Sequence, residues 1–341
     1  MNNFAIIFGT RPEYLKIKPI INKFKTQNIL KYKVIYVTQH ENINEDIDET
    51  YIKLIIDNCK LTNRLSDIGL QILNTLPNLI HDCSHIIVQG DTATAFYSAL
   101  TGFQLNKQII HIEAGLRTYD LSKPFPEECY RQMISRITSI HFTPHDDSSI
   151  ILKNEKVFGE ILNVGNTILD QIKSYNLTCS MENIVLITFH RRENWDKIDD
   201  LLIGLKKLII KTPEIKYLWY LHMNPDLQKK VKESICNIPS IILKQPCNHI
   251  EFTEQMAKSN FIITDSGGIQ EEASFLGKHC IVLRKSTERT HIPEKYITIL
   301  EEYSHIDKIY DLIPKEHLPV CNIYGNGDSS FKIINYLSIL N

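Results

Sequence analysis

The sequence of 341 residues lacks the patterns that mark several common classes of protein. Its eight cysteines stand singly, without a Cys-x-x-Cys pair, which argues against a zinc site or a disulfide framework. No apolar stretch approaches the length of a membrane span, and the first residues, MNNFAIIFGTRPE, have neither the basic region nor the apolar run of a signal peptide. We therefore expect a cytoplasmic protein that does not bind a membrane.

An excess of charge of one sign is also lacking. The 38 basic and 40 acidic residues leave a formal net charge of −2, and no block of like charge forms a tail. Proteins that bind nucleic acids use many cations against the phosphate backbone, so nucleic acid is not an expected partner. The chain has neither a Gly-x-Gly-x-x-Gly fingerprint nor a Walker-type loop, which disfavours a nicotinamide cofactor and hydrolysis of a nucleoside triphosphate.

Short apolar runs alternate with amphipathic segments in two series along the chain. The predicted strands are 4–9, 32–38, 85–90, 109–114 and 139–144 in the first series and 183–189, 216–222, 240–246, 261–267 and 280–285 in the second. Apolar residues have helical spacing at 15–27, 129–138, 202–212 and 269–277. Parallel strands need a crossover, which a helix supplies, so the pattern predicts an α/β protein with parallel sheets.

The length and the second series of strands favour two domains. A helix followed by a polar linker is predicted at 166–182, where the first series ends. We expect one Rossmann-like domain at 1–172, a second at 173–325, and a last amphipathic helix within 326–341 whose N-cap is Asp328 or Ser329.

Uncommon polar residues follow the predicted strands in both series. GTRPEYLK follows the first strand, and GDT, EAGLRT, HRREN, DSGGIQEE and RKSTER follow later strands. The carboxyl ends of strands in doubly wound sheets open onto the ligand crevice, and helix N-termini point into it. The positions of these motifs therefore predict a cleft that both halves line.

Carboxylates of the first half are candidates for acid–base chemistry. Asp91 could instead cap the next helix, and Glu127 with Glu128 could be a first-turn pair after Pro126 that the helix dipole favours. Glu113 has fewer structural explanations, because it ends a buried strand. Several carboxylates near one site suit removal of a proton from a weakly acidic carbon, since repulsion and desolvation raise their pKa values.

The second half offers candidates for binding a phosphate group. His190 ends a predicted strand and is followed by Arg191 and Arg192, a combination that suits a phosphate leaving group. A lone histidine is more often structural, and this applies also to His222 at the end of another strand.

A glycine-rich turn in the second half is a further candidate for phosphate binding. Ser266, Gly267 and Gly268 lie between a strand and a helix, where backbone amides can approach a phosphate. A carboxylate at Glu271 or Glu272 could accept hydrogen bonds from a ribose diol. The same Ser-Gly-Gly turn also occurs in proteins as a simple connection.

Taken together, these motifs resemble those of the non-hydrolysing UDP-N-acetylglucosamine 2-epimerase family. The matching motifs, in the family's order from residue 9 to residue 289, are GTRPEYLK, QGDT, HIEAGLRT, PFPEE, VGNTILD, FHRREN, HMNP, TDSGGIQEEASFLGK and LRKSTER. The resemblance implies two Rossmann-like domains facing a cleft, as in GT-B glycosyltransferases, with the last helix crossing back to the first domain. It also implies a homodimer that needs neither a metal ion nor a cofactor.

The resemblance further implies a UDP-sugar substrate. The family interconverts UDP-GlcNAc and UDP-ManNAc by anti elimination of UDP, which gives a 2-acetamidoglucal, and by re-addition. The catalytic group implied by motif match is Asp91, Glu113, Glu127 and His190. The residues implied in substrate binding are Arg11, Lys16, Arg117, Arg131, His222, Phe252 at the uracil, Ser266, Gly267 and Gly268 at the diphosphate, Glu272 at the ribose, and Arg289.

One departure from the family's pattern bears on regulation. The family's TGQHRQ, near the site of an activating second UDP-GlcNAc, reads VTQHENIN here, with Glu41 and Asn42 in place of Arg and Gln. An anion that replaces a cation repels a diphosphate, so weak or absent activation is expected.

Three other functions are compatible with parts of the same pattern. The hydrolysing branch of the epimerases releases ManNAc and UDP, but its first motif typically reads GSRAEY where this chain has GTRPEY. A GT-B glycosyltransferase would have the same two halves, although it needs one base rather than three carboxylates. A non-catalytic UDP-sugar sensor would not need the acidic residues. The motifs also fit deoxy or 3-acetamido relatives of the GlcNAc substrate.

Overall fold

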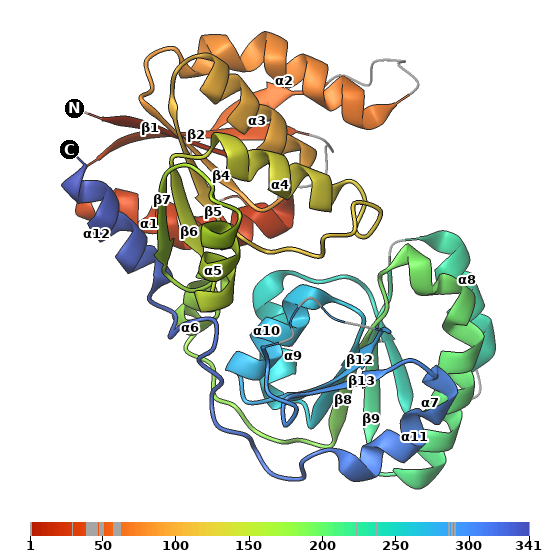
Figure 1. The fold of residues 1–341 in the computed structure, drawn as a ribbon. Coiled ribbons are helices and arrows are strands. Elements are labelled where there is room, and N and C mark those ends of the chain that lie inside the picture. Colours follow the sequence, from red (N-terminus) through yellow and green to blue (C-terminus); the bar gives the residue numbers. More distant parts are fainter. Residues whose placement is uncertain are drawn as a thin grey trace. The chain divides into compact units, whose positions relative to one another are not determined.

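The chain divides into two compact units (Figure 1). The computed structural model describes residues 2–28, 30–38, 47, 51–56, 63–222, 224–235, 238–285, 287, 289 and 291–340. Unit 1 is Met1–Ser174 with Tyr324–Asn341, and unit 2 is Tyr175–Ile323. Within these described ranges, no helix combines the length and the apolar character that crossing a bilayer requires.

Unit 1 is built on a seven-stranded parallel sheet. Its elements are β1 (Asn3–Phe8), α1 (Arg11–Gln27), β2 (Lys31–Thr38), β3 (Ile52–Ile55), α2 (Arg64–Ile80), β4 (His85–Gln89), α3 (Ala93–Gln104), β5 (Gln108–Ile112), α4 (Glu127–Ile137), β6 (Ile140–Thr143), α5 (Asp146–Asn154), β7 (Glu160–Asn163), α6 (Thr167–Ser174) and α12 (Ser329–Ile339). The strand order is β3-β2-β1-β4-β5-β6-β7. Strands covered on both faces read as continuous apolar runs, which explains FAIIF and IIHI.

Helices cover both faces of this sheet. On one face, α1 and α12 pack with β1, β5 and β6 in one apolar core, and α6 contacts both helices. On the other face, α2, α3 and α4 enclose a second core. Asp170 of α6 accepts hydrogen bonds from the backbone N–H groups of Ser329 (3.0 Å) and Ser330 (2.7 Å), and so caps the start of α12. The cap residue itself, Asp328, makes no capping hydrogen bond with its side chain.

Unit 2 has a six-stranded parallel sheet. Its elements are β8 (Ile184–Thr188), η2 (Arg192–Lys197), α7 (Ile198–Lys211), β9 (Lys216–Tyr220), α8 (Pro225–Ile235), β10 (Ile241–Lys244), α9 (His249–Lys258), β11 (Phe261–Thr264), α10 (Gly267–Phe275), β12 (His279–Leu283), β13 (Ile297–Leu300), η3 (Tyr303–His305), α11 (Ile306–Ile309) and η4 (Tyr310–Leu312). The strand order is β10-β9-β8-β11-β12-β13. Helices α7, α8 and α11 pack on one face, while α9 and α10 lie on the other.

Each sheet has one position where the direction of its crossovers reverses. In unit 1 this position lies between β1 and β4, and in unit 2 it lies between β8 and β11. The turns that leave the carboxyl ends of two neighbouring strands diverge there, which leaves room for a ligand. The motifs after β1, β4, β8 and β11 therefore occupy the positions at which doubly wound folds bind ligands.

Candidate functional site

Glu13 joins the two turns at the point of reversal in unit 1. Its Oε2 accepts hydrogen bonds from the N–H groups of Gly9 (3.0 Å) and Thr10 (2.7 Å), and its Oε1 accepts one from Thr92 Oγ1 (2.6 Å). The side chain is 2% exposed, and burial raises the pKa of its carboxyl above the ordinary value of 4.5. Glu13 thereby fixes the turn that carries Arg11, although the sequence analysis did not select it. The Thr-x-x-Glu capping box was the signal that could have found it.

The carboxylate of Glu113 lies among hydrogen-bond donors at the end of β5. Lys16 Nζ is 2.7 Å from its Oε1 and 2.6 Å from its Oε2, and Gln89 Nε2 also donates to Oε2. The backbone of Glu113 is left-handed, with φ of 64°, a conformation that costs free energy for a residue other than glycine. This strain at a predicted catalytic residue is typical of a functional site. Lys16, predicted to bind the nucleotide, is the ion-pair partner of Glu113 in this structure.

Asp91 lies in the turn after β4 and pairs with Arg131 of α4. The N-cap of α3 is its neighbour Thr92, whose side chain accepts from the N–H of Ala95 at 3.1 Å. The alternative that Asp91 caps this helix is therefore wrong. Arg131 lies one turn after Glu127, so the ion pair ties Asp91 to the helix that begins with Glu127.

The two adjacent glutamates of α4 have different surroundings. Glu128 is fully buried and accepts hydrogen bonds from the N–H groups of Thr118 (2.9 Å) and Tyr119 (3.1 Å) and from Gln132 Nε2 (2.7 Å). Glu127 Oε2 is shielded from solvent and has no hydrogen-bond partner among the described residues. Glu128 is thus engaged in holding the loop before α4, whereas Glu127 keeps an oxygen that can act on a ligand.

Arg117 has its hydrogen bonds within unit 1. Its Nε and Nη2 donate to Glu155 at 2.8 and 3.0 Å, and Nη2 also donates to Ser135 Oγ at 2.7 Å. The side chain is fully buried in this arrangement. Its predicted role in nucleotide binding stays a prediction. Glu41 and Asn42, on which the prediction about activation depends, lie outside the described residues.

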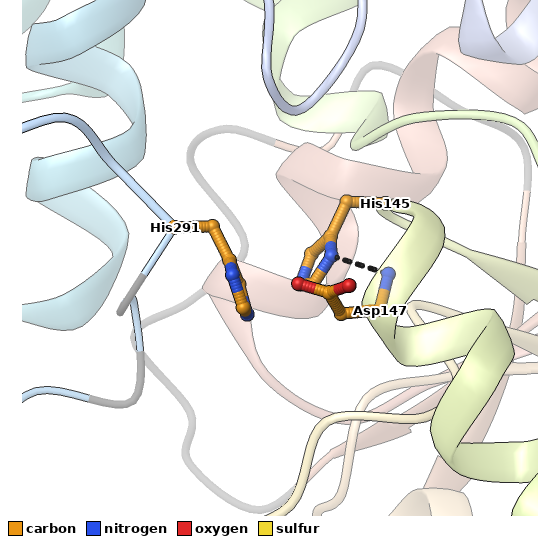
Figure 2. Close-up of side chains that lie close together, drawn as sticks. All are labelled: His145, Asp147 and His291. Carbon is orange, nitrogen blue, oxygen red and sulfur yellow. Dashed lines mark hydrogen bonds between the residues drawn. The ribbon is translucent and has the colours of Figure 1, made fainter.

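His145 and Asp147 lie close together at the start of α5 (Figure 2). His145 is the N-cap, and its Nδ1 accepts a hydrogen bond from the N–H of Asp147 at 3.1 Å. Its Nε2 lies 3.3 Å from Ser148 Oγ, and the edge of its ring meets Tyr324 with the ring centroids 5.3 Å apart. This imidazole therefore acts as a helix cap within unit 1.

Asp265 has in unit 2 the role that Glu13 has in unit 1, although it follows the other strand of the pair at the point of reversal. Its carboxylate follows β11 and accepts hydrogen bonds from the N–H groups of His190 (3.0 Å) and Arg191 (2.8 Å), which follow β8, and from Asn194 Nδ2 (3.1 Å). The backbone oxygen of Asp265 accepts from Arg284 Nε at 2.8 Å. Asp265 is completely buried and so fixes the turn that carries His190. The sequence analysis missed both Asp265 and Asn194, although each lies in a motif it had selected.

His190 and His222 follow neighbouring strands, β8 and β9, with ring centroids 5.8 Å apart. The surrounding protein removes part of the hydration of His190 and lowers its pKa below 6.5. Asp265 opposes this shift, and His222 adds to it. His190 is therefore mostly neutral at pH 7 and can donate a hydrogen bond from one ring nitrogen. His222 uses its Nδ1 to accept from the N–H of Asn224 at 3.0 Å.

The predicted phosphate-binding turn forms the start of a helix. Ser266 is the N-cap of α10, and Gly267 and Gly268 are its first two residues. Its side chain makes no capping hydrogen bond with the described residues, so the first amides of α10 can serve an anion. Phe252, predicted to contact the uracil, lies on α9 with its ring edge-on to Tyr220 and the centroids 5.1 Å apart.

The second pair of adjacent glutamates also divides into two roles. Glu271 is buried and pairs with Arg289, whose Nε is 2.6 Å from Glu271 Oε1. Arg289, predicted to bind substrate, is thus the partner of a structural acid in this structure. Glu272 is paired with His249, whose Nε2 is 2.9 Å from Glu272 Oε2.

The fold and these two groups of side chains define an α/β protein of two Rossmann-like units, one with clustered carboxylates and one with a helix start suited to a phosphate. The sequence model of the UDP-N-acetylglucosamine 2-epimerase family matches residues 22–338 of the chain. The chain therefore belongs to the UDP-N-acetylglucosamine 2-epimerase family. The predicted family and α/β fold are confirmed.

Individual relatives match over almost the whole chain. The UDP-N-acetylglucosamine 2-epimerase of Campylobacter jejuni is 35% identical over an alignment of 386 positions, which covers 99% of this chain and 97% of the relative. A crystal structure of the Neisseria meningitidis UDP-GlcNAc 2-epimerase bound to UDP-GlcNAc superposes with a TM-score of 0.88 at 29% identity and covers 99% of this chain and 100% of its own. The Methanocaldococcus jannaschii UDP-GlcNAc 2-epimerase in complex with UDP-GlcNAc and UDP gives 0.80 at 26% identity and covers 99% of both chains.

Proposed function

We propose that this protein is a non-hydrolysing UDP-GlcNAc 2-epimerase that interconverts UDP-GlcNAc and UDP-ManNAc. The observation that supports this most is the set of three carboxylates in unit 1. Asp91 and Glu113 follow the carboxyl ends of the neighbouring strands β4 and β5. The Asp91–Arg131 ion pair links Asp91 to α4, the helix that begins with Glu127. Family membership and the solved complexes of relatives with UDP-GlcNAc add to this support.

The proposed reaction needs a proton acceptor and a proton donor at the sugar. One carboxylate removes the proton from C2, the C1–O bond breaks, and its electron pair leaves with UDP. The product is a 2-acetamidoglucal with a C1–C2 double bond. In the return step, UDP oxygen attacks C1 and a second carboxylic acid delivers a proton to the opposite face of C2. Asp91, Glu113 and Glu127 supply these groups, and their negative charge stabilises the developing oxocarbenium character at C1.

The proposed role of unit 2 is to hold the UDP group. The first amides of α10 face the diphosphate, and Glu272 accepts hydrogen bonds from the ribose. Neutral His190 donates a hydrogen bond to the departing phosphate, and Asp265 keeps the His190 turn in place. Phe252 contacts the uracil ring. No redox step occurs, since the same atoms are eliminated and added back.

Turnover of UDP-GlcNAc in D2O tests this proposal. We expect UDP-ManNAc to form and deuterium to enter C2 of both epimers, as seen by NMR, because each passage through the glycal exchanges that proton. Full retention of protium at C2 in both sugars would refute the mechanism. Release of free ManNAc and UDP would instead identify a hydrolysing enzyme, and the absence of any reaction without an acceptor would favour a glycosyltransferase.

A further inference from the structure

His249 makes a hydrogen-bonded connection that the sequence motifs did not reveal. It is the first residue of α9, and its two ring nitrogens contact residues from two different parts of unit 2. Its Nε2 lies 2.9 Å from Glu272 Oε2 on α10, and its Nδ1 lies 2.9 Å from the hydroxyl of Tyr175. Tyr175 is the residue at which unit 2 begins. The proposed ribose ligand, Glu272, is therefore linked through His249 to the first residue of the unit.

The chemistry of the three groups determines which of them donates and which accepts in each hydrogen bond. An ionised carboxylate only accepts hydrogen bonds, so the His249 Nε2 must carry a proton to bond with Glu272. In a neutral imidazole the Nδ1 is then an acceptor, and the Tyr175 hydroxyl is the donor that satisfies it. The carboxylate thus fixes the imidazole tautomer, and the phenol satisfies the nitrogen that this tautomer leaves as an acceptor.

The structure also restrains the position of the imidazole. Asn248 is the N-cap of α9 and accepts from the N–H of Glu251 at 2.9 Å, while the carbonyl oxygen of His249 accepts from Thr253 Oγ1 at 2.6 Å. The side chains of His249 and Glu272 are only 11% and 12% exposed. Restricted access to water strengthens the hydrogen bond between them and reduces the freedom of the carboxylate.

The second oxygen of Glu272 lies on the side of the phosphate-binding turn. A Cβ atom placed on Gly268 would be 3.9 Å from Glu272 Oε1, so this oxygen lies next to the start of α10. His249 holds Oε2, and Oε1 is the atom directed toward the turn at which the diphosphate is proposed to bind.

We propose that His249 is a positioning residue that orients Glu272 to recognise a ribose diol, with Tyr175 restraining the imidazole ring through its hydrogen bond to Nδ1. The consequence is discrimination of ribonucleotides from 2′-deoxyribonucleotides at the nucleotide site of unit 2. This inference rests on the proposed function, because that function places the ribose at Glu272. A carboxylate that is already oriented loses less freedom when the hydroxyl groups bind, so its preference for the diol is larger.

Calorimetric titration of the full chain with UDP and with 2′-deoxy-UDP tests the proposal. We expect the wild-type protein to bind UDP more tightly than 2′-deoxy-UDP, and His249→Ala to reduce this ratio by about tenfold, the effect of losing one charge-assisted hydrogen bond. The affinity for 2′-deoxy-UDP should change much less. Tyr175→Phe should reduce the ratio by a smaller factor, because the imidazole loses the restraint at Nδ1 but Nε2 can still donate to Glu272.

A matched control and a conservative variant separate positioning from general damage. His305→Ala removes a histidine that is 40% exposed and pairs with Glu302 at 2.7 Å, and should leave the UDP to 2′-deoxy-UDP ratio unchanged. His249→Gln retains an N–H donor and should recover part of the ratio. Thermal unfolding of each variant shows whether it folds. If His249→Ala does not fold, the two single variants Tyr175→Phe and His249→Gln provide the test.

The result that would overturn the inference is a folded His249→Ala variant that keeps the wild-type ratio, or a wild-type protein that binds both nucleotides equally. These outcomes are independent of turnover. If the wild-type protein fails to epimerise UDP-GlcNAc but its ribose preference depends on His249, the proposed reaction is wrong and the positioning role stands.

Discussion

The substitution Asp265→Asn tests the role of the buried carboxylate that supports the His190 turn. The side chain keeps its shape but loses its charge, and one oxygen becomes an NH2 group. In the native arrangement the N–H of His190 donates to both oxygens, at 3.0 Å to Oδ1 and 3.2 Å to Oδ2, and Oδ2 also accepts from the N–H of Arg191 at 2.8 Å and from Asn194 Nδ2 at 3.1 Å. All of these groups are donors, so the new NH2 group has no acceptor in either orientation.

The amide orientation that loses fewer hydrogen bonds keeps its oxygen at the Oδ2 position. Arg191 and Asn194 then retain their acceptor, and the N–H of His190 keeps only its longer hydrogen bond of 3.2 Å, while the new NH2 group at the Oδ1 position is a buried donor without a partner. Loss of a hydrogen bond to a charged group costs about 1.5–3 kcal/mol, and a buried donor without a partner costs about 1–3 kcal/mol. Because these two figures describe overlapping effects, we expect the free energy of unfolding of unit 2 to fall by about 2–4 kcal/mol. For a domain of this size, the unfolding temperature should fall by about 5–15 °C.

Scanning calorimetry measures this loss, and steady-state kinetics measure its effect on His190. Asp265→Asn should lower the unfolding temperature of the unit 2 transition and reduce kcat, because the turn that carries His190 loses an anchor. Asp199→Asn is the control, since Asp199 is 65% exposed and its pair with Lys230 is a surface ion pair worth about 1 kcal/mol or less. An Asp265→Asn variant that unfolds at the same temperature as Asp199→Asn would refute the reasoning.

Three further predictions concern other acidic residues. Glu127→Gln should lower kcat by about two orders of magnitude with an unchanged Kd for UDP, as expected for a group that acts in the transition state. Glu128→Gln should instead lower the unfolding temperature. A loss of kcat in Glu128→Gln and a loss of stability in Glu127→Gln would exchange the roles of the two residues. Burial raises the pKa of Glu13 above 4.5, so its contribution to stability is full below pH 4.5 and falls as the pH rises through the folded-state pKa. Glu13→Gln keeps an oxygen that can accept from the N–H groups of Gly9 and Thr10 but has no carboxyl to titrate, so its unfolding temperature relative to wild type should increase between pH 5 and pH 8, and a difference independent of pH would contradict this. Glu41 replaces a cation of the family, so forward rates should be hyperbolic in UDP-GlcNAc and UDP-ManNAc should react without added UDP-GlcNAc; a sigmoidal curve with no reverse turnover would show that activation persists.

The central strands were predictable because burial on both faces makes them continuous apolar runs. All ten predicted strands begin within one residue of an observed strand. The strands that the sequence analysis missed, β3, β7 and β13, lie at sheet edges. β3 and β7 carry mostly exposed or partly buried side chains, and a strand with one solvated face has too short an apolar pattern to stand out from a loop.

The positions of the candidate groups were predictable from their motifs, but their supporting contacts were not. Asp265 meets His190 across 75 residues of sequence, and Thr92 meets Glu13 across 79. Such contacts follow from strand order, which places β1 beside β4 and β8 beside β11. In both units one buried carboxylate joins the two turns at the point where the crossovers reverse. In each unit one of the two turns presents backbone N–H groups that need an acceptor, and a buried carboxylate that contacts or belongs to the other turn supplies it.

Adjacent acids show most clearly what only the fold can decide. Glu127 and Glu128 are the same residue type one position apart, and so are Glu271 and Glu272, so composition and charge do not separate them. Neighbouring residues on a helix point about 100° apart, which directs one carboxylate of each pair deeper into the protein than the other. The inward acids, Glu128 and Glu271, find internal donors and hold loops in place. The functional assignment therefore depends on helix phase, and helix phase is set by which apolar neighbours on α4 and α10 must face the sheet.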